Sequence, residues 1–383
     1  MLKKFEVKDF KNFKEKITID FANIGGYQFS TDCIIDNFLG KVLIYGRNGT
    51  GKSNLGLAIM DIVNNFTSSL LRFNDSAYLN ADSDDNCVDY IYTFIFDETD
   101  VIYKYRKFST FELRDEELIV NGKRIFYCNY FEAEFKFDNL SYVSAESVVT
   151  ERFLSSIKEI KSSDDIIDKV TIPFLRWLIS NSVLTSNSVL LKLNDFVKRM
   201  SILTVGGMVM YRTRKGYDNF FEILSDKNEL TKFEDFLNLM GMECQLVSKK
   251  LPDKTELYFK HKRLIPFFEN ASSGTIALLN MYRRYFIGAT PSLMYLDEFD
   301  AFYHFEMAEN LLKYFKFRFP KSQVIFTSHN TNLISNRLLR PDCIFILSRT
   351  GKLTSLSNAT QRELREGHNL QKMYISGEFE RYE

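Results

Sequence analysis

The stretch that decides the fold lies near the N-terminus and reads Lys41-Val42-Leu43-Ile44-Tyr45-Gly46-Arg47-Asn48-Gly49-Thr50-Gly51-Lys52-Ser53. Its first five residues are nearly all apolar, which is typical of a strand covered on both faces. The glycines that follow allow a tight backbone turn. Beyond Ser53 the pattern predicts a helix to about Phe66, with apolar residues at Leu55, Ile59, Ile62 and Val63. The order is therefore buried strand, glycine-rich loop and helix.

This loop fits the pattern Gly-x-x-x-x-Gly-Lys-Ser/Thr at every defined position, which predicts a phosphate-binding loop. Successive N–H groups of the curled backbone point at phosphate oxygens, and the helix that follows adds the positive end of its dipole. Lys52 is expected to reach the β- and γ-phosphates of ATP, and the Ser53 hydroxyl to ligate Mg²⁺. The predicted nucleotide-binding residues here are Gly46, Asn48, Gly49, Gly51, Lys52 and Ser53.

A second motif, Met294-Tyr295-Leu296-Asp297-Glu298, ends a short apolar strand in two acids. Asp297 is expected to hold the Mg²⁺ through water, and Glu298 to act as a catalytic residue that polarises the attacking water. Alone, the motif is equally well a strand that ends in two solvated acids, but the phosphate-binding loop favours the functional interpretation. His329 follows the next predicted strand and is the second predicted catalytic residue, placed to contact the γ-phosphate.

The segment Ala271-Ser272-Ser273-Gly274-Thr275 opens a further helix, and a Ser and a Gly at a helix N-terminus form an anion site. By spacing alone this signal is weak, since Ser-Ser-Gly is also a common loop and helix cap. All four motifs in this order resemble the ATP-binding-cassette (ABC) ATPases of the SMC, recombination-repair and OLD branch. The resemblance implies that Ser272 and Gly274 complete the ATP site of a second subunit, and that Asp300 lies in the D-loop.

The N-terminal Phe10-Lys11-Asn12-Phe13 also resembles the opening strand of that branch, which helps to seat the nucleotide. A closer resemblance is to stand-alone AAA-type ATPases of bacterial anti-phage and abortive-infection operons. It rests on Ser272–Thr275, on Leu296–Asp300 followed by His304, and on the tail from Leu364 to Phe379. It implies a separately encoded effector, frequently a nuclease of the TOPRIM type, as in PARIS-like systems. Too few residues follow His329 for such a nuclease, so we expect a separate toxin or nuclease.

The predicted fold class is α/β: a P-loop ABC-type ATPase head with a β-rich N-terminal lobe and a helical insertion. Residues 1–143 are expected to form the N-terminal part of the head, with the phosphate-binding loop and the β lobe. Residues 144–240 are predicted to be the helical insertion, and residues 241–383 the C-terminal part with the signature, the acidic pair and the switch histidine. Strands and helices alternate in this last part, which is typical of a parallel sheet, and a helix is predicted from about Asn332 to Leu339.

The chain of 383 residues contains 50 Lys and Arg and 50 Asp and Glu, so its formal net charge is zero. That excludes a uniformly basic nucleic-acid coat protein and an acidic solvating protein. No apolar run approaches the length of a membrane span and the N-terminus lacks the core of a signal peptide, so we expect a cytoplasmic protein with no membrane partner. Five widely spaced cysteines predict reduced thiols, without disulfides or a zinc site.

Three basic-aromatic clusters keep nucleic acid open as a partner, because Lys and Arg bind phosphates and aromatic rings stack on bases. They are Tyr211–Tyr217, Tyr258–Arg263 and Tyr282–Tyr285. A solvated face with buried rings is the favoured interpretation of each. The leading hypothesis is an ATPase, homo-oligomeric through its ATP sites, that senses infection and controls a partner toxin or nuclease. The alternatives are a DNA-binding clamp of the repair type and a scaffold with rare turnover.

Overall fold

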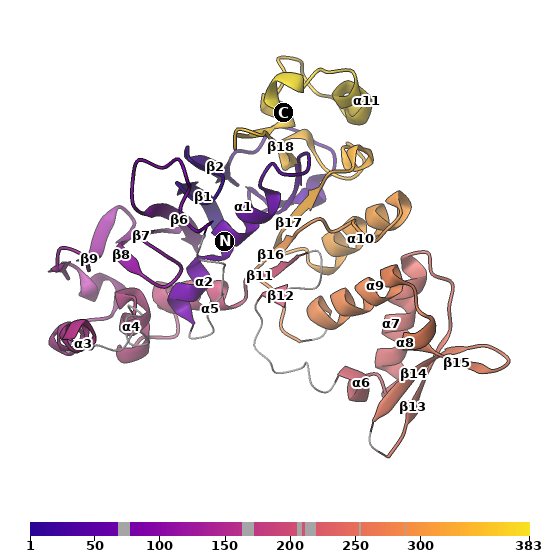
Figure 1. Cartoon of the computed structure of the whole chain (residues 1–383), viewed down its shortest axis with the longest axis horizontal. Coiled ribbons are helices and arrows are strands. Elements are labelled where there is room, and N and C mark those ends of the chain that lie inside the picture. Colours follow the sequence, from indigo (N-terminus) through magenta and orange to yellow (C-terminus); the bar gives the residue numbers. More distant parts are fainter. Residues whose placement is uncertain (68–76, 163–171, 205–208, 211–219, 253, 287) are drawn as a thin grey trace.

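The computed structural model describes residues 1–383 except 68–76, 163–171, 205–208, 211–219, 253 and 287. An antiparallel sheet forms the N-terminal lobe (Figure 1). Its strands alternate buried and partly exposed residues, as expected of a sheet with one covered face. In spatial order they are β10 (Glu134–Lys136), β9 (Lys123–Asn129), β8 (Leu113–Val120), β7 (Thr99–Lys107), β6 (Val88–Phe96), β1 (Leu2–Lys8) and β2 (Ile17–Asp20).

A second sheet forms the centre of the molecule and is parallel except at its two edges. Its three middle strands are buried along their whole length, because other elements cover both faces. In spatial order the strands are β12 (Val209–Met210), β11 (Ser201–Leu203), β16 (Leu293–Leu296), β17 (Gln323–Ser328), β5 (Lys41–Tyr45), β18 (Ile344–Leu347) and β19 (Leu353–Ser355). The predicted α/β class is confirmed.

Two smaller sheets and the helices complete the described part of the chain. A three-stranded antiparallel sheet consists of β13 (Leu246–Lys250), β14 (Thr255–Lys260) and β15 (Leu264–Pro266), and a short pair of β3 (Ile34–Ile35) and β4 (Phe38–Leu39). The helices are α1 (Lys52–Met60), α2 (Ile62–Phe66), α3 (Thr150–Ser162), α4 (Phe174–Asn181), α5 (Val189–Lys198), α6 (Phe220–Ile223), α7 (Lys227–Leu239), α8 (Phe267–Asn270), α9 (Ser273–Tyr285), α10 (Phe305–Arg318) and α11 (Leu370–Ile375). Within the described ranges, no helix has both the length and the apolar character that a membrane crossing requires.

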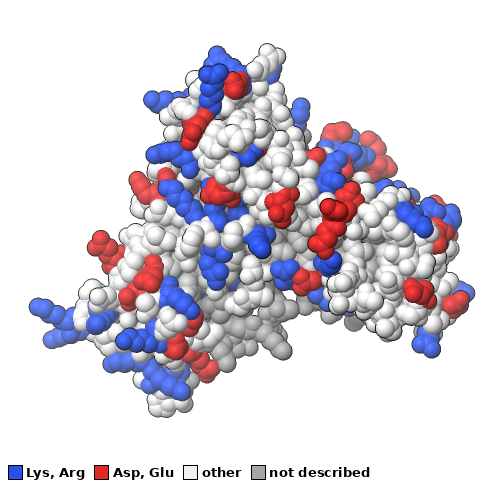
Figure 2. Space-filling model, turned by 180° about the vertical axis from the view of Figure 1, so that it is seen from behind, with Lys and Arg blue, Asp and Glu red and all other residues white. Residues whose placement is uncertain are grey.

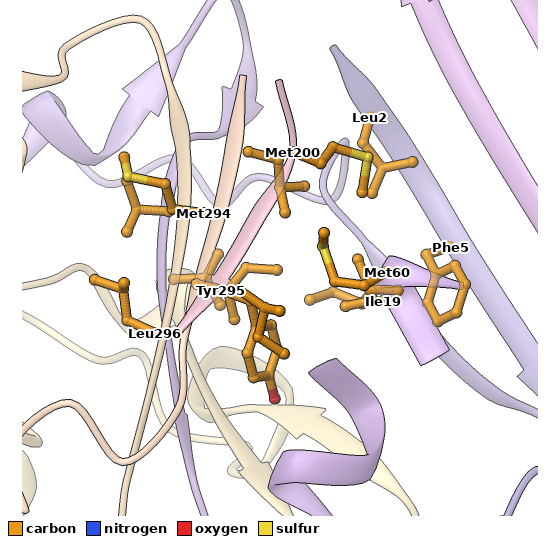
Figure 3. Close-up of a cluster of buried hydrophobic side chains, with 14 of the residues drawn as sticks. Leu2, Phe5, Ile19, Met60, Met200, Met294, Tyr295 and Leu296 are labelled. Atoms are coloured by element: carbon orange, nitrogen blue, oxygen red, sulfur yellow. The ribbon is translucent and has the colours of Figure 1, made fainter. Parts of the chain in front are cut away.

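Helix α1 is held between the two large sheets. The Tyr92 hydroxyl on β6 donates a hydrogen bond to the Ala58 carbonyl, and the Tyr295 hydroxyl on β16 donates one to the Lys52 carbonyl. Apolar side chains from both sheets fill the space around this helix, as Figure 3 shows. Those labelled there are almost fully buried: Leu2, Phe5, Ile19, Met60, Met200, Met294, Tyr295 and Leu296. The position of the phosphate-binding loop is therefore fixed by both sheets.

Two local predictions differ from the structure. The segment 144–240 contains helices, but Ser201–Leu203 within it is a strand that pairs in parallel with β16 and so belongs to the central sheet. Three residues are too few to show a strand period, and the pairing alone decides their structure. The predicted helix from Asn332 to Leu339 is wrong, because only a 3-10 turn at Thr331–Leu333 forms. Asn330 caps that turn, and the Asn336 amide instead donates to backbone carbonyls near Arg365. The domain boundaries themselves stay a prediction.

Candidate active site

The predicted phosphate-binding loop follows β5 directly, and its backbone has the conformation that its glycines allow. Gly49 and Gly51 have φ angles of 82° and 99°, which residues with a Cβ rarely adopt. A Cβ on Gly46 would lie 2.7 Å from the Thr50 hydroxyl and 3.1 Å from the Leu347 carbonyl. These positions therefore demand glycine for two reasons, conformation at two of them and close packing at the third.

Lys52 begins α1 and folds back over the loop. Its side chain is only 4% exposed, and its Nζ donates to the carbonyls of Gly46 at 2.8 Å and Arg47 at 3.2 Å. Burial lowers the pKa of this ammonium, although the nearby carboxylates of Glu298 and Asp297 oppose the shift. A desolvated cation at the start of a helix suits a phosphate group as a further partner.

The next residue, Ser53, meets Asp297 although 244 positions separate them. The Ser53 hydroxyl donates to Asp297 Oδ2 at 2.6 Å, and the Thr327 hydroxyl donates to Oδ1 at 2.8 Å. Burial raises the pKa of Asp297, while both hydrogen bonds lower it. A hydroxyl and a carboxylate side by side are a hard-oxygen donor set that suits Mg²⁺.

This donor set fits Mg²⁺ only together with a nucleotide. Among the described residues, no three His, Cys, Asp or Glu side chains gather to hold a metal ion. Mg²⁺ typically takes one or two protein ligands and completes its octahedron with phosphate oxygens and water. Ser53 and Asp297 are therefore the residues that would hold the ion, and they fit it as part of a nucleotide site.

Glu298 follows Asp297 in a strained backbone conformation. Its φ angle is 43°, in the left-handed region, where a residue other than glycine needs support from its surroundings. Its N–H donates to the Thr327 hydroxyl at 2.8 Å, and its carboxylate lies 3.8 Å from Lys52 Nζ. The side chain is 29% exposed, so water reaches it. This geometry suits a carboxylate that orients a water molecule beside a phosphate.

Sequence reasoning assigned no role to Thr327, which the structure places between the two acids. It is fully buried on β17, next to β16, and its one hydroxyl contacts both Asp297 and Glu298. The only sequence signal was its position just before His329 in the strand that ends at the same sheet edge. This geometry suits a positioning residue, because the hydroxyl contacts the Asp297 carboxylate and the backbone N–H of Glu298.

His329 is exposed just beyond β17, close to the predicted D-loop. The Asp300 carboxylate accepts a hydrogen bond from Ser328 at 2.8 Å. Burial raises the pKa of Asp300, and this hydrogen bond and the charge of His329 oppose that shift. The structure therefore brings His329 to the sheet edge that carries the acidic pair.

The signature residues form a separate group. Ser272 caps α9, where its hydroxyl accepts from the Thr275 N–H at 3.1 Å. A Cβ on Gly274 would lie 3.1 Å from the Phe302 carbonyl, so glycine lets the helix start approach the segment after Asp300. In the described part of the chain, no hydrogen bond joins Ser272 or Gly274 to the phosphate-binding loop. Their predicted role at the ATP site of a second copy stays a prediction.

Comparison with known proteins identifies the family of this chain. A family described as "AAA domain, putative AbiEii toxin, Type IV TA system" matches residues 42–335. The chain belongs to this family. The matched range begins in β5 and extends beyond His329, so it contains every predicted site residue. No curated protein matches the chain.

Similar solved structures are SMC head domains. One is an SMC head bound to the C-winged helix domain of ScpA, with 18% identity, coverage of 92% of this chain and 97% of that chain, and a TM-score of 0.48. The SMC head domain from Thermotoga maritima is 15% identical, with coverage of 92% and 98% and a TM-score of 0.43. A third, derived from Pyrococcus furiosus, has an extended coiled coil and is bound to the C-terminal domain of ScpA, with 17% identity, coverage of 92% and 96% and a TM-score of 0.46.

Two further segments of this AAA-domain chain contact the loop. The Asn12 amide donates to the Thr50 carbonyl at 3.2 Å and accepts from the Asn54 amide at 2.7 Å, so it braces the loop from the N-terminal lobe. The Phe10–Phe13 segment itself is a turn after β1 and not a strand, and its expected help in seating the nucleotide stays a prediction. From the C-terminal side, Glu383 pairs with Arg47 at 2.5 Å, a contact that sequence reasoning missed. Asn48 is exposed at the tip of the loop.

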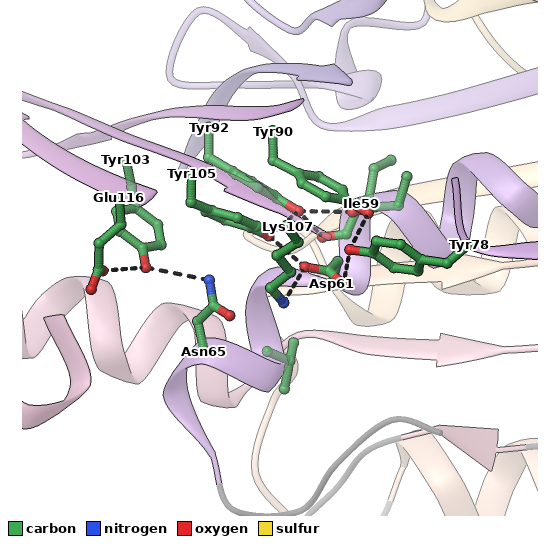
Figure 4. A network of polar contacts seen from close by, with 12 residues as sticks. Ile59, Asp61, Asn65, Tyr78, Tyr90, Tyr92, Tyr103, Tyr105, Lys107 and Glu116 are labelled. Carbon is green, nitrogen blue, oxygen red and sulfur yellow. Dashed lines mark hydrogen bonds and ion pairs between the residues drawn. The ribbon is translucent and has the colours of Figure 1, made fainter. Parts of the chain in front are cut away.

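A buried polar network joins the end of α1 to the antiparallel sheet (Figure 4). Asp61, between α1 and α2, forms an ion pair with Lys107 at 2.7 Å, and both side chains are almost fully buried. Asp61 also accepts from the hydroxyls of Tyr78 and Tyr105 at 3.2 and 2.8 Å. Because a buried charge is costly without partners, this set of contacts ties α1 to the N-terminal lobe.

Proposed function

We propose that this AAA-domain protein binds and hydrolyses ATP at the site built from the phosphate-binding loop and the acidic pair. The observation that carries the proposal is the contact of Ser53 with Asp297, beside a buried Lys52 that lies 3.8 Å from Glu298. The loop N–H groups and Lys52 bind the phosphates, and Ser53 and Asp297 hold Mg²⁺. A bound Mg²⁺ supplies charge neutralisation on the phosphate oxygens.

In the proposed reaction, Glu298 orients a water molecule and accepts its proton. The water oxygen forms a bond to the γ-phosphorus while the bond from that phosphorus to the β–γ bridging oxygen breaks, which yields ADP and phosphate. Thr327 holds Asp297 and Glu298 in fixed positions relative to each other. His329 lies at the same sheet edge and is proposed to contact the γ-phosphate. Most of the rate enhancement then comes from positioning and charge stabilisation.

We infer that the working site is shared between two copies of the chain. Ser272 caps α9 and Gly274 lies in its first turn, where helix-terminal N–H groups suit an anionic ligand, and within the described residues no hydrogen bond joins either residue to the loop of its own chain. A head-to-tail arrangement of two copies would place each signature on the other copy's ATP. Binding of ATP would then drive dimerisation, and hydrolysis would loosen the dimer.

For the biological role, we propose that the ATPase controls a separately encoded toxin or nuclease in bacterial anti-phage defence. The family description, which names a putative AbiEii toxin and a toxin–antitoxin system, supports a setting of this kind. The tail and signature resemblances point in the same direction. A DNA-binding clamp is the second candidate, and it is favoured by an exposed basic turn between β14 and β15.

A mixing experiment tests the shared site. We expect Lys52→Ala and Ser272→Arg to abolish turnover separately, because one loses the phosphate contact and the other blocks the signature. In a mixed dimer, the chain with the intact loop meets the chain with the intact signature, so one of two sites is restored. Since half of the dimers in an equal mixture are mixed, activity should return to about a quarter of wild type. No recovery on mixing would contradict the shared site.

A variant that is trapped in the ATP-bound state tests the biological role. Glu298→Gln replaces the carboxylate by a carboxamide of the same size, which cannot accept the proton. We therefore expect at least ~100-fold slower turnover with ATP binding retained. This variant should persist as a dimer with ATP in size-exclusion chromatography with light scattering. Recovery of a stoichiometric toxin or nuclease with it from the native host would support the defence role. Recovery of DNA alone would favour the clamp, and an unchanged turnover rate would refute the assignment of Glu298.

A further inference from the structure

The small sheet of β13–β15 is unusually basic for this chain. Residues 246–266 contain six Lys or Arg and two Asp or Glu, whereas the whole chain has equal numbers of each. The turn between β14 and β15 has four successive basic residues, all of them exposed: Lys260, His261, Lys262 and Arg263. We call these four residues the basic turn. Figure 2 shows Lys and Arg gathered over the part of the molecule that contains this small sheet, at the lower left of the view.

Of the two basic-aromatic clusters that lie within the described residues, the basic turn belongs to the exposed one. The cluster at 211–217 lies outside the described residues. In the cluster on α9, Tyr282, Arg284 and Tyr285 are buried, and Arg284 donates to the Ser201 hydroxyl. That cluster packs the signature helix against the central sheet, so its role is structural.

The cations of the basic turn are also not neutralised. Within the described residues, no ion pair involves Lys260, Lys262 or Arg263, whereas Lys254 at the other end of the sheet pairs with Glu256 at 2.6 Å. Exposed cations without partners keep their full charge for a ligand, since no existing contact must be broken. The Lys249 ammonium lies 5.6 Å from the centre of the Tyr258 ring and extends the basic surface along the outer face.

We propose that the basic turn is a docking surface for the phosphodiester backbone of a nucleic acid. Three exposed cations within four residues can each contact a backbone phosphate, and contacts of this kind bind without reading the base sequence. An acidic protein partner fits this surface less well, because protein interfaces bury apolar side chains along with charge. Leu246 and Leu257 of the sheet are buried and Phe259 is partly buried against the core, so among the described residues of this sheet Ile265, at 36% exposure, is the one exposed large apolar side chain.

The position of the turn links it to the proposed ATP site. β15 follows the turn and leads straight into α8, and α9 begins three residues after α8 ends. Phe267 on α8 is fully buried and stacks on Phe259 of β14, with ring centroids 4.8 Å apart. A ligand that anchors the hairpin therefore restrains the segment that carries Ser272. We infer that nucleic acid raises the rate of ATP turnover by ordering the signature; this part rests on the proposed function.

Fluorescence anisotropy with a short labelled DNA duplex, and with RNA and single-stranded DNA of the same sequence, tests the docking surface. The variant is Lys260→Ala, Lys262→Ala and Arg263→Ala together, in the full chain. If each cation contacts one phosphate, the slope of log affinity against log salt should decrease by roughly 2 to 3, and affinity at low salt should fall. A matched control removes three exposed cations from the other lobe: Lys123→Ala, Arg124→Ala and Lys136→Ala.

The outcomes separate the possibilities. Loss of binding in the basic-turn variant but not in the control supports the proposal, and the preferred probe then identifies DNA or RNA as the ligand. Equal binding by wild type and variant, or an equal loss in the control, overturns it. Absence of nucleic-acid binding with tight binding of polyglutamate also overturns it and indicates a protein partner.

Turnover without nucleic acid should be the same in wild type and in both variants. If wild type itself does not hydrolyse ATP, the proposed function fails while the binding comparison still stands. If nucleic acid binds without changing turnover, the link to the signature is refuted.

Discussion

Replacement of Thr327 by valine tests whether one buried hydroxyl aligns the two acids of the site. Valine has nearly the same shape, so the change removes the hydroxyl with little effect on packing around β17. Two hydrogen bonds are lost: the one to Asp297 Oδ1 at 2.8 Å, and the one from the Glu298 N–H, also at 2.8 Å. The site otherwise keeps every side chain that is proposed to touch nucleotide or metal.

The expected size of the effect follows from burial. A buried polar group that loses its partner costs about 1–3 kcal/mol, and Thr327 is fully buried. The change leaves both the Asp297 oxygen and the Glu298 N–H without this partner, so we expect the free energy of unfolding to fall by about 2–3 kcal/mol in total. The left-handed φ of Glu298 also loses a restraint, and a shift of about 1 Å in a catalytic group costs on the order of 100-fold in rate.

Chemical denaturation and steady-state ATPase kinetics measure these two effects. We expect Thr327→Val to lower kcat, to raise the Mg²⁺ concentration that gives half-maximal rate, and to leave ATP binding to the loop nearly unchanged. Thr327→Ser retains the hydroxyl and should recover most of kcat, which a purely structural role would not explain. Wild-type kinetics in the valine variant, or equal losses in both variants, would refute the positioning role.

Two further predictions concern packing and charge around the same sheet. Burial lowers the pKa of Lys41 to about 8 from its ordinary 10.5. Between these two pH values the folded chain has released a proton that the unfolded chain still holds. The free energy of unfolding therefore rises with pH in this range, by up to about 3 kcal/mol. Lys41→Met should remove this rise with pH. Urea denaturation of wild type and variant from pH 7 to 10 measures it, and a stability difference that stayed constant over this range would contradict the reasoning. Gly56→Ala should lower stability by about 1–3 kcal/mol, because the added Cβ would lie 2.5 Å from the Tyr295 ring. The control Gly367→Ala meets nothing within 4 Å and should have little effect in the same thermal denaturation assay.

Sequence reasoning worked best where a function needs residues in succession. The phosphate-binding loop and the acidic pair were both recognisable, because each lies at the end of a short apolar strand in a continuous motif. It failed for β11, whose three residues become a strand only by pairing with β16. It failed again after β17, where asparagine side chains compete for backbone groups and prevent the helix that the apolar residues suggest.

The local pattern of residues determined the α/β class, the curled loop and the identity of the proposed phosphate and metal contacts. Those features depend on backbone conformation and on neighbouring residues, which the order of amino acids specifies directly. The tertiary structure alone decided that Thr327 lies between Asp297 and Glu298, that Asn12 braces the loop, and that Asp61 forms a buried ion pair with Lys107. These contacts join elements far apart in the chain, so they exist only after the strands have paired and the helices have packed.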